Sequence, residues 1–496
     1  MSALRLSPAR ARANANLSTS IRNDRASQTP GRALLAPRQR EFRTLSELSY
    51  PTVVKRWPVI ITSIVSTVTN VNHSLHQSPT PETEAKLVEG KGIISKLSSL
   101  KYEMGRNFVL LPIEEDGEGN VTCYNDELAM YTQDEKRWFT MNWLFAEYRR
   151  LRNYFAMTQH WRDFDPFFTS KADTYKSSSG AIIHLAKALN GMIEQSDLLK
   201  DFEAQGSPLE IAFMEIIQAD LWGNATDLSL LVDLKYEDLQ KLQAVGAAAQ
   251  AEQAKLILRN DLGQVWEFMK RLQRGRVDIV LDNAGFELYT DFVFADFLIS
   301  CTPFVGEVVF HSKSIPWLIE FIIPLVTFTR SHSTSWAIDS LLDREFFASA
   351  STLPTPTDTQ NLSVLAHRWK SHLASGRFRL SVPLDTTLGN ESDSEIGGFW
   401  TTQFAYQDLP TAAPNLLNEM KKSDLVVFKG DLNYRKLVGD AKWNPTTSFE
   451  EALGPLAGKI TLLSLRTNKA DTIVGLRQGI EAKLDESNPD WRISGK

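Results

Sequence analysis

Cysteine is scarce in this sequence, and its scarcity narrows the class of protein. The 496 residues hold two cysteines, Cys123 and Cys301, without metal-ligand spacing. We therefore expect neither a disulfide framework nor a cysteine-based zinc cluster, and a reducing compartment such as the cytoplasm fits.

Long apolar runs are also missing. The longest candidate, residues 315–328, contains a glutamate and two prolines, and it is shorter than the roughly 20 residues of a membrane-spanning helix. We therefore expect no membrane partner. The net charge is -6, although residues 1–50 carry nine arginines, no lysine and three acidic residues. The rest of the chain is acidic, which argues against nucleic acid as the main ligand.

The basic start has no apolar periodicity, and residues 1–44 are predicted to form a disordered tail. Removal of residues 1–40 is expected to leave activity unchanged. Its Arg- and Ser-rich composition also resembles an organelle transit peptide. Mitochondrial targeting therefore stays open beside a cytoplasmic location.

Three glycine motifs of common enzyme classes are absent. The sequence has no Gly-x-x-x-x-Gly-Lys-Ser/Thr loop, no Gly-x-Gly-x-x-Gly fingerprint and no Gly-x-Ser-x-Gly elbow. P-loop nucleotide enzymes, dinucleotide-binding folds and serine hydrolases of the elbow type are therefore disfavoured.

Two hydrophobic patterns are present. Apolar residues at helical spacing predict a mostly helical domain over residues 45–265. From residue 266 to 496, helical stretches alternate with short apolar runs suited to buried strands: VDIVLD (277–282), VGEVVFH (305–311), DLVVFKG (424–430) and KITLLSL (459–465). This alternation predicts an α/β domain with a largely parallel sheet covered by helices, where ligands bind beyond the carboxyl ends of the strands.

The first predicted strand runs into oxygen donors. Asp282 and Asn283 suit Mg²⁺ or Mn²⁺, and Gly285 permits a tight turn into a helix that carries Glu287 and Asp291 on one face. A simple turn and helix cap explains the same residues, and by itself this explanation is the commoner one.

Cations and amides follow two later strands. The segment GDLNYRK, residues 430–436, combines a glycine-led turn with Arg435 and Lys436, which suits a phosphate or a sugar hydroxyl array. RTNK, residues 466–469, places two cations and a hydroxyl at another strand end. A solvated helix start and a surface loop are the alternatives for the separate segments. Taken together, metal-binding oxygens and cations predict metal-assisted phosphoryl transfer.

These motifs closely resemble the damage-control phosphatase family, in its Arg-Thr-x-Lys subfamily of sugar-phosphate phosphatases and acidic residue methyltransferases. The segments that carry the resemblance include LDNAGFELYTDFVFADFL (281–298), FKGDLNYRKLVGDAKW (428–443) and LRTNKADTIVGL (465–476). The resemblance extends from about residue 45 to 485. It implies a helical N-terminal domain on a Rossmann-like α/β/α domain, with a divalent metal at the junction. Mn²⁺ is the foremost candidate, with Ni²⁺, Co²⁺ and Mg²⁺ as alternatives.

The resemblance also implies roles for single residues. Asp282 and Asn283 would bind the metal, and Asp282 would be the catalytic residue beside the reacting phosphate. S-adenosylmethionine would lie near Glu287 if the chain transfers methyl groups. The substrate would be held by Asp431, Leu432, Asn433, Tyr434 and Arg435, with Lys469 on its phosphate.

One position departs from the family pattern. Phe321 stands where the resemblance leads us to expect a metal-binding aspartate. Either Glu320 has taken over as the third ligand, or residues 318–335 contain sequence from a misjudged splice site. The second explanation is the stronger, because this segment fits neither strand nor helix patterns well.

The resulting hypothesis is a metal-dependent phosphatase of metabolite damage control that hydrolyses small sugar phosphates such as fructose 1-phosphate or fructose 6-phosphate. Attack by Asp282 and attack by a metal-bound water are both open. The alternatives are S-adenosylmethionine-dependent methylation of protein carboxylates and an inactive homologue with an incomplete metal site. The oligomeric state is not predicted.

Overall fold

In the described part of the chain, six strands form one sheet in the order β1-β6-β5-β2-β3-β4. The computed structural model describes residues 2–5, 52–117, 121–147, 150–195, 202–223, 256–313, 336–343, 354–382, 396–488 and 491–492. The strands are β1 (Ser2–Arg5), β2 (Gly275–Val280), β3 (Val305–His311), β4 (Phe378–Leu380), β5 (Leu425–Lys429) and β6 (Leu462–Leu465). Strands β2 to β6 pair in parallel, and β1 pairs with β6 in antiparallel orientation. The predicted α/β class with a largely parallel sheet is confirmed.

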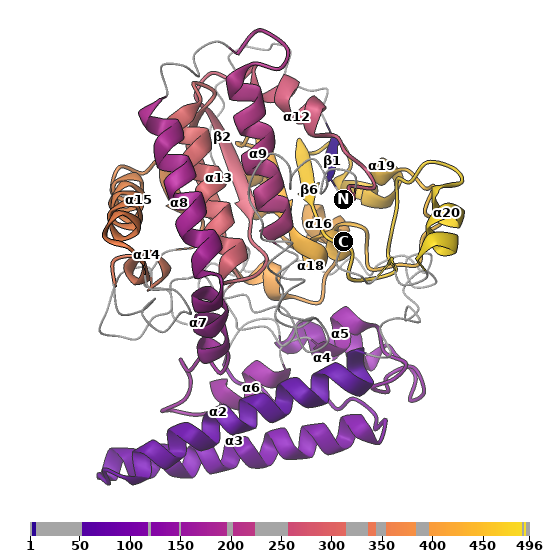
Figure 1. Cartoon of the computed structure of the whole chain (residues 1–496). Helices are drawn as coiled ribbons and strands as arrows, with labels where there is room; N and C mark the ends of the chain where they lie inside the picture. The colour runs from indigo at the N-terminus through magenta and orange to yellow at the C-terminus, as the bar shows by residue number, and fades with distance from the viewer. Residues whose placement is uncertain are drawn as a thin grey trace, which may run out of the picture.

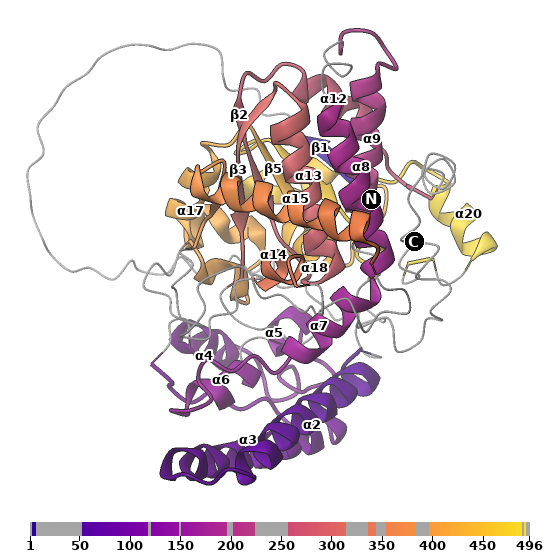
Figure 2. The same cartoon turned by 60° about the vertical axis from the view of Figure 1, so that its left-hand side comes forward.

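Helices cover both faces of the sheet. Side chains alternate between the two faces along each strand, so apolar residues on each face need a layer of helices to bury them. Val277 and Ile279 of β2 pack into one apolar core, whereas Val280 packs into another. The first core is shared with α8 (Ser179–Glu194), α9 (Pro208–Gly223), α12 (Leu262–Met269), α13 (Phe286–Cys301), α14 (Trp336–Ser340) and α15 (Pro356–Ala374) (Figure 2). The second core is shared with α16 (Leu409–Ala412), α17 (Pro414–Met420), α18 (Gly430–Leu437) and α19 (Phe449–Leu453).

A separate helical layer lies below the sheet in the view of Figure 1. Its long helices are α2 (Trp57–His76) and α3 (Pro81–Gly105), and Thr80 caps the start of α3 in a capping box with Thr83. The shorter ones are α4 (Val121–Ala129), α5 (Trp143–Glu147) and α6 (Arg150–Ala156). Their apolar core also takes in Leu432 of α18. Since α18 follows the carboxyl end of β5, the helical layer packs against the edge of the sheet where ligands bind in such folds.

The cores divide the chain at a different place from the predicted boundary at residue 265. The core of the helical layer ends at Phe167, and Tyr175 of α7 (Phe168–Ser177) already belongs to the core of the sheet, as do residues of α8 and α9. Apolar periodicity predicts a helix and its buried face, but not the partner of that face.

The ends of the chain add two observations. Ser2–Arg5 forms the edge strand β1, so the prediction of a disordered tail is wrong for these four residues. The rest of the predicted tail lies outside the described residues. Near the other end, α20 (Ile480–Ser487) has no buried residue. No helix in the described ranges combines the length and apolar character needed to cross a membrane.

Candidate active site

Polar segments meet where the parallel strands end. Pairing places Val280 of β2 beside His311 of β3 and Phe428 of β5, and Lys429 beside Leu465 of β6. The residues that follow these strands therefore lie at one edge of the sheet, as the sequence predicts for three of the four segments. The fourth segment follows β3 and contains Lys313.

Asp282 and Asn283 follow β2 and are buried, with Asp282 fully shielded. Glu287, in the first turn of α13, accepts hydrogen bonds from Asn283 Nδ2 at 2.8 Å and from the Asn283 backbone N–H at 3.4 Å. Asn283 Nδ2 also donates to Asp282 Oδ2 at 3.3 Å. Because a carboxylate only accepts, these contacts turn the amide nitrogen of Asn283 toward Glu287 and Asp282. Asn283 Oδ1 then points elsewhere, and it makes no hydrogen bond within the described part of the chain.

Gly430 brings the start of α18 against Asp282. Its φ of +79° lies in the left-handed region, and a Cβ added there would lie 1.5 Å from Asp282 Oδ2. Only glycine fits such a close approach. The amide of Asn433 fixes the same turn, because Nδ2 donates to the carbonyl oxygens of Lys429 at 2.7 Å and Leu281 at 3.1 Å.

The side chains predicted to hold the substrate have protein partners. Asp431 accepts from Arg466 Nε at 2.6 Å, and the Arg466 guanidinium lies 4.1 Å from the ring centroid of Tyr434. Arg435 donates from Nε and Nη2 to Asp440 at 2.6 and 3.0 Å. Burial raises the pKa of Asp440, and Arg435 opposes that rise.

Leu432, Asn433 and Tyr434 have structural contacts in the described residues. Leu432 packs in the core of the helical layer, and Asn433 Oδ1 accepts from the Tyr406 hydroxyl at 2.6 Å. The Tyr434 hydroxyl accepts from the Val474 backbone N–H at 3.1 Å. Lys469 is half-buried, three residues beyond Arg466. Substrate contact by any of these six residues stays a prediction.

Lys313 is a candidate that the sequence reasoning missed. Its ammonium nitrogen is buried, 3.6 Å from Asp282 Oδ1 and 3.5 Å from the Leu281 carbonyl oxygen. Lys313 follows β3 by two residues, so the strand-end argument applied to VGEVVFH could have found it. Lys313 and Asp282 therefore form a buried ion pair at the edge of the sheet.

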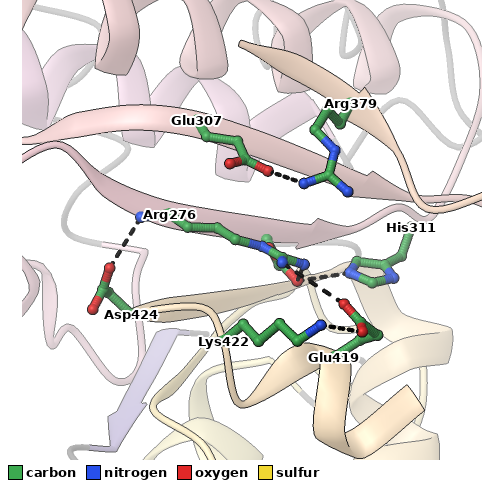
Figure 3. A network of polar contacts seen from close by, with 8 residues as sticks. Arg276, Glu307, His311, Arg379, Glu419, Lys422 and Asp424 are labelled. Atoms are coloured by element: carbon green, nitrogen blue, oxygen red, sulfur yellow. Dashed lines mark hydrogen bonds and ion pairs between the residues drawn. The ribbon is translucent and has the colours of Figure 1, made fainter. Parts of the chain in front are cut away.

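A second network of polar contacts, shown in Figure 3, joins β2 to β3. The buried carboxylate of Asp278 accepts from Arg276 Nε at 2.7 Å and Nη2 at 2.9 Å, and His311 Nε2 lies 2.9 Å from it. Burial acts to raise the pKa of Asp278, but His311 and Arg276 together hold it below its ordinary value. Since His311 ends β3, this network fixes the strand that leads to Lys313.

The oxygens of Asp282 and Asn283 fit a hard divalent cation, because carboxylate and amide oxygens are its usual protein ligands. In the part of the chain that the structure describes, no group of three or more His, Cys, Asp or Glu side chains could hold a metal ion. The predicted third ligand, Glu320, lies outside the described residues, as do Phe321 and the whole segment 318–335. The metal ligands therefore stay predictions.

Comparison with known proteins identifies the family. A family model described as the damage-control phosphatase ARMT1-like domain matches residues 52–484 of this chain. The chain belongs to the ARMT1-like damage-control phosphatases. This membership confirms the resemblance predicted from the strand-end motifs, and it implies phosphatase activity in metabolite damage control.

Individual relatives of this damage-control phosphatase are similar over nearly the whole chain. Damage-control phosphatase ARMT1 of Xenopus laevis is 33% identical over 466 residues, covering 90% of this chain and 94% of its own. The Danio rerio protein of that name is 31% identical over 480 residues, covering 93% and 96%. A solved structure of a DUF89 family protein from Pyrococcus horikoshii aligns over 86% of this chain and 93% of its own, with 12% identity and a TM-score of 0.33.

Proposed function

We propose that this chain is a metal-dependent phosphatase that hydrolyses small sugar phosphates, of the fructose 1-phosphate or fructose 6-phosphate kind. The observation that carries the proposal is the orientation of the Asn283 amide. The amide nitrogen donates to Glu287 at 2.8 Å and to Asp282 Oδ2 at 3.3 Å, so the amide oxygen, which accepts no hydrogen bond in the described residues, is left for a cation. Buried partners of this kind set the orientation of metal ligands.

A divalent cation held by Asp282 and Asn283, with Mn²⁺ as the first candidate, would polarise the phosphoryl oxygens. Lys313 lies near Asp282 and offsets negative charge where the phosphate enters. Arg435 and Lys469 would offset the charge that develops on the phosphate oxygens. Asp282 then either attacks phosphorus or orients the attacking water.

The test is a panel of sugar phosphates assayed for phosphate release by the full chain, with and without added Mn²⁺, Ni²⁺, Co²⁺ or Mg²⁺. We expect metal-dependent release that is lost in Asp282→Asn, a variant of nearly the same volume. Asp485→Asn is the matched control, because Asp485 lies on α20, which has no buried residue. Release without metal, or full turnover in Asp282→Asn, would overturn the proposal. Binding of labelled S-adenosylmethionine without phosphate release would replace it with methyl transfer.

A further inference from the structure

Lys429, the last residue of β5, has a fully buried ammonium group. Three oxygen atoms surround it, namely Asp220 Oδ1 at 2.5 Å, the Asp220 carbonyl oxygen at 2.7 Å and Asp291 Oδ1 at 3.0 Å. The Asp220 carbonyl oxygen accepts a hydrogen bond from Nζ, and the two carboxylate oxygens form ion pairs with it. The position of Nζ is therefore fixed from three directions by α9 and α13.

Burial and the neighbouring charges act on the pKa values of Lys429 and Asp291. Burial acts to lower the pKa of Lys429, but Asp220 and Asp291 raise it above its ordinary value, so the ammonium stays charged. Burial is the largest cause of a pKa of Asp291 well above its usual range, and Asp220 and Glu287 raise it further against the effect of Lys429.

The cluster is continuous with the candidate active site. Lys429 directly precedes Gly430, which lies so close to Asp282 that an added Cβ would clash with its carboxylate. On the other side, α9 ends at Gly223, where an added Cβ would lie 2.3 Å from Thr290 Oγ1 and 3.3 Å from the Glu287 Cα. The end of α9 is therefore packed directly on the first turn of α13, which carries Glu287.

We propose that Lys429 is a positioning residue, whose ammonium group, held between Asp220 and Asp291, fixes the Gly430 turn against Asp282. The proposal rests on the proposed function, in which Asp282 is the reacting or metal-binding carboxylate. Lys429 itself does not contact the substrate. It sets where α18 begins, and a small shift of that start moves the groups around the phosphate.

The competing explanation is that Lys429 only balances buried charge. Lys429→Met alone would leave the Asp220 carboxylate buried without its counter-ion, which destabilises the fold by itself. The double variant Lys429→Met/Asp220→Asn removes one charge of each sign at similar volume. Arg368→Met is the matched control, because it breaks another ion pair to a buried aspartate of α13, Asp296, at 2.8 Å.

The experiment measures phosphate release, urea unfolding and amide hydrogen exchange of the full-length variants. For the double variant we expect stability near that of the wild type, a kcat at least about tenfold lower and a KM within about threefold. Amides of residues 430–434 should exchange faster, whereas Arg368→Met should change neither kcat nor those amides.

A double variant with wild-type kcat and unchanged exchange at residues 430–434 would overturn the positioning role. Equal losses of kcat in the double variant and Arg368→Met would overturn it too, since general loosening would then explain both. If the wild-type chain releases no phosphate from any substrate, the proposed function fails. Hydrogen exchange still decides in that case whether Lys429 fixes the turn.

Discussion

Replacing Gly430 with alanine tests the geometry of the site most directly. The new Cβ would lie 1.5 Å from Asp282 Oδ2, 2.2 Å from its Cγ and 2.7 Å from its Cβ. Ordinary contact between heavy atoms begins at roughly 3.5 Å, so the α18 start and the Asp282 carboxylate must separate by about 2 Å. The left-handed φ of +79° adds roughly 1–2 kcal/mol of backbone strain for any residue with a side chain.

The expected effect on turnover exceeds the effect of strain alone. A misplacement of about 1 Å can lower a rate by about 10²-fold, which equals about 2.7 kcal/mol in the barrier. We therefore expect kcat for phosphate release to fall by at least about 10²-fold in Gly430→Ala. The unfolding free energy should fall by roughly 1–2 kcal/mol or more.

Gly479→Ala separates the two effects. Gly479 has a φ of +81°, and an added Cβ would meet no described atom within 4 Å. The Gly479→Ala variant should therefore lose roughly 1–2 kcal/mol of unfolding free energy, as Gly430→Ala does, but keep the wild-type kcat. Near-normal turnover in Gly430→Ala, measured beside urea unfolding of both variants, would refute the argument. An equal loss of turnover in Gly479→Ala would do the same.

Four further outcomes are expected. Asp282→Asn should lower phosphatase activity by at least about 10²-fold with the fold intact by circular dichroism, and near-normal turnover would contradict the assignment. Lys469→Ala should raise KM without releasing metal, as calorimetry with Mn²⁺ would show; metal loss in proportion to activity would contradict it. Glu320→Gln should weaken Mn²⁺ binding if Glu320 is the third ligand, and full affinity would exclude it. Asp278→Asn should lower the free energy of unfolding at pH 7 by about 3–5 kcal/mol. Since the folded pKa of Asp278 lies below its unfolded value, this deficit should shrink as the pH falls below about 4; a deficit independent of pH would refute it.

The sequence by itself determined the elements and the chemistry available at their ends. Runs such as LVVF (425–428) are apolar on both faces, and this pattern is local, so it predicts buried strands without knowledge of their neighbours. The candidate metal ligands Asp282 and Asn283 are also predicted from a local pattern, because they are oxygen donors placed directly after a buried strand. The parallel sheet then implied that such ends meet at one edge.

Only the tertiary structure decided which polar groups pair at that edge. Lys429 donates to the carbonyl oxygen of Asp220, which lies 209 residues away in the sequence, and Asp431 accepts from Arg466. These pairs depend on the strand order, in which β5 lies between β2 and β6, and on α9 packing with the sheet. Local periodicity encodes the type of an element and its buried face, whereas the partner of each buried charge is set by contacts between distant segments. The sequence therefore predicts a phosphate-binding turn at Gly430, whereas its close approach to Asp282 depends on the packing of β5 beside β2.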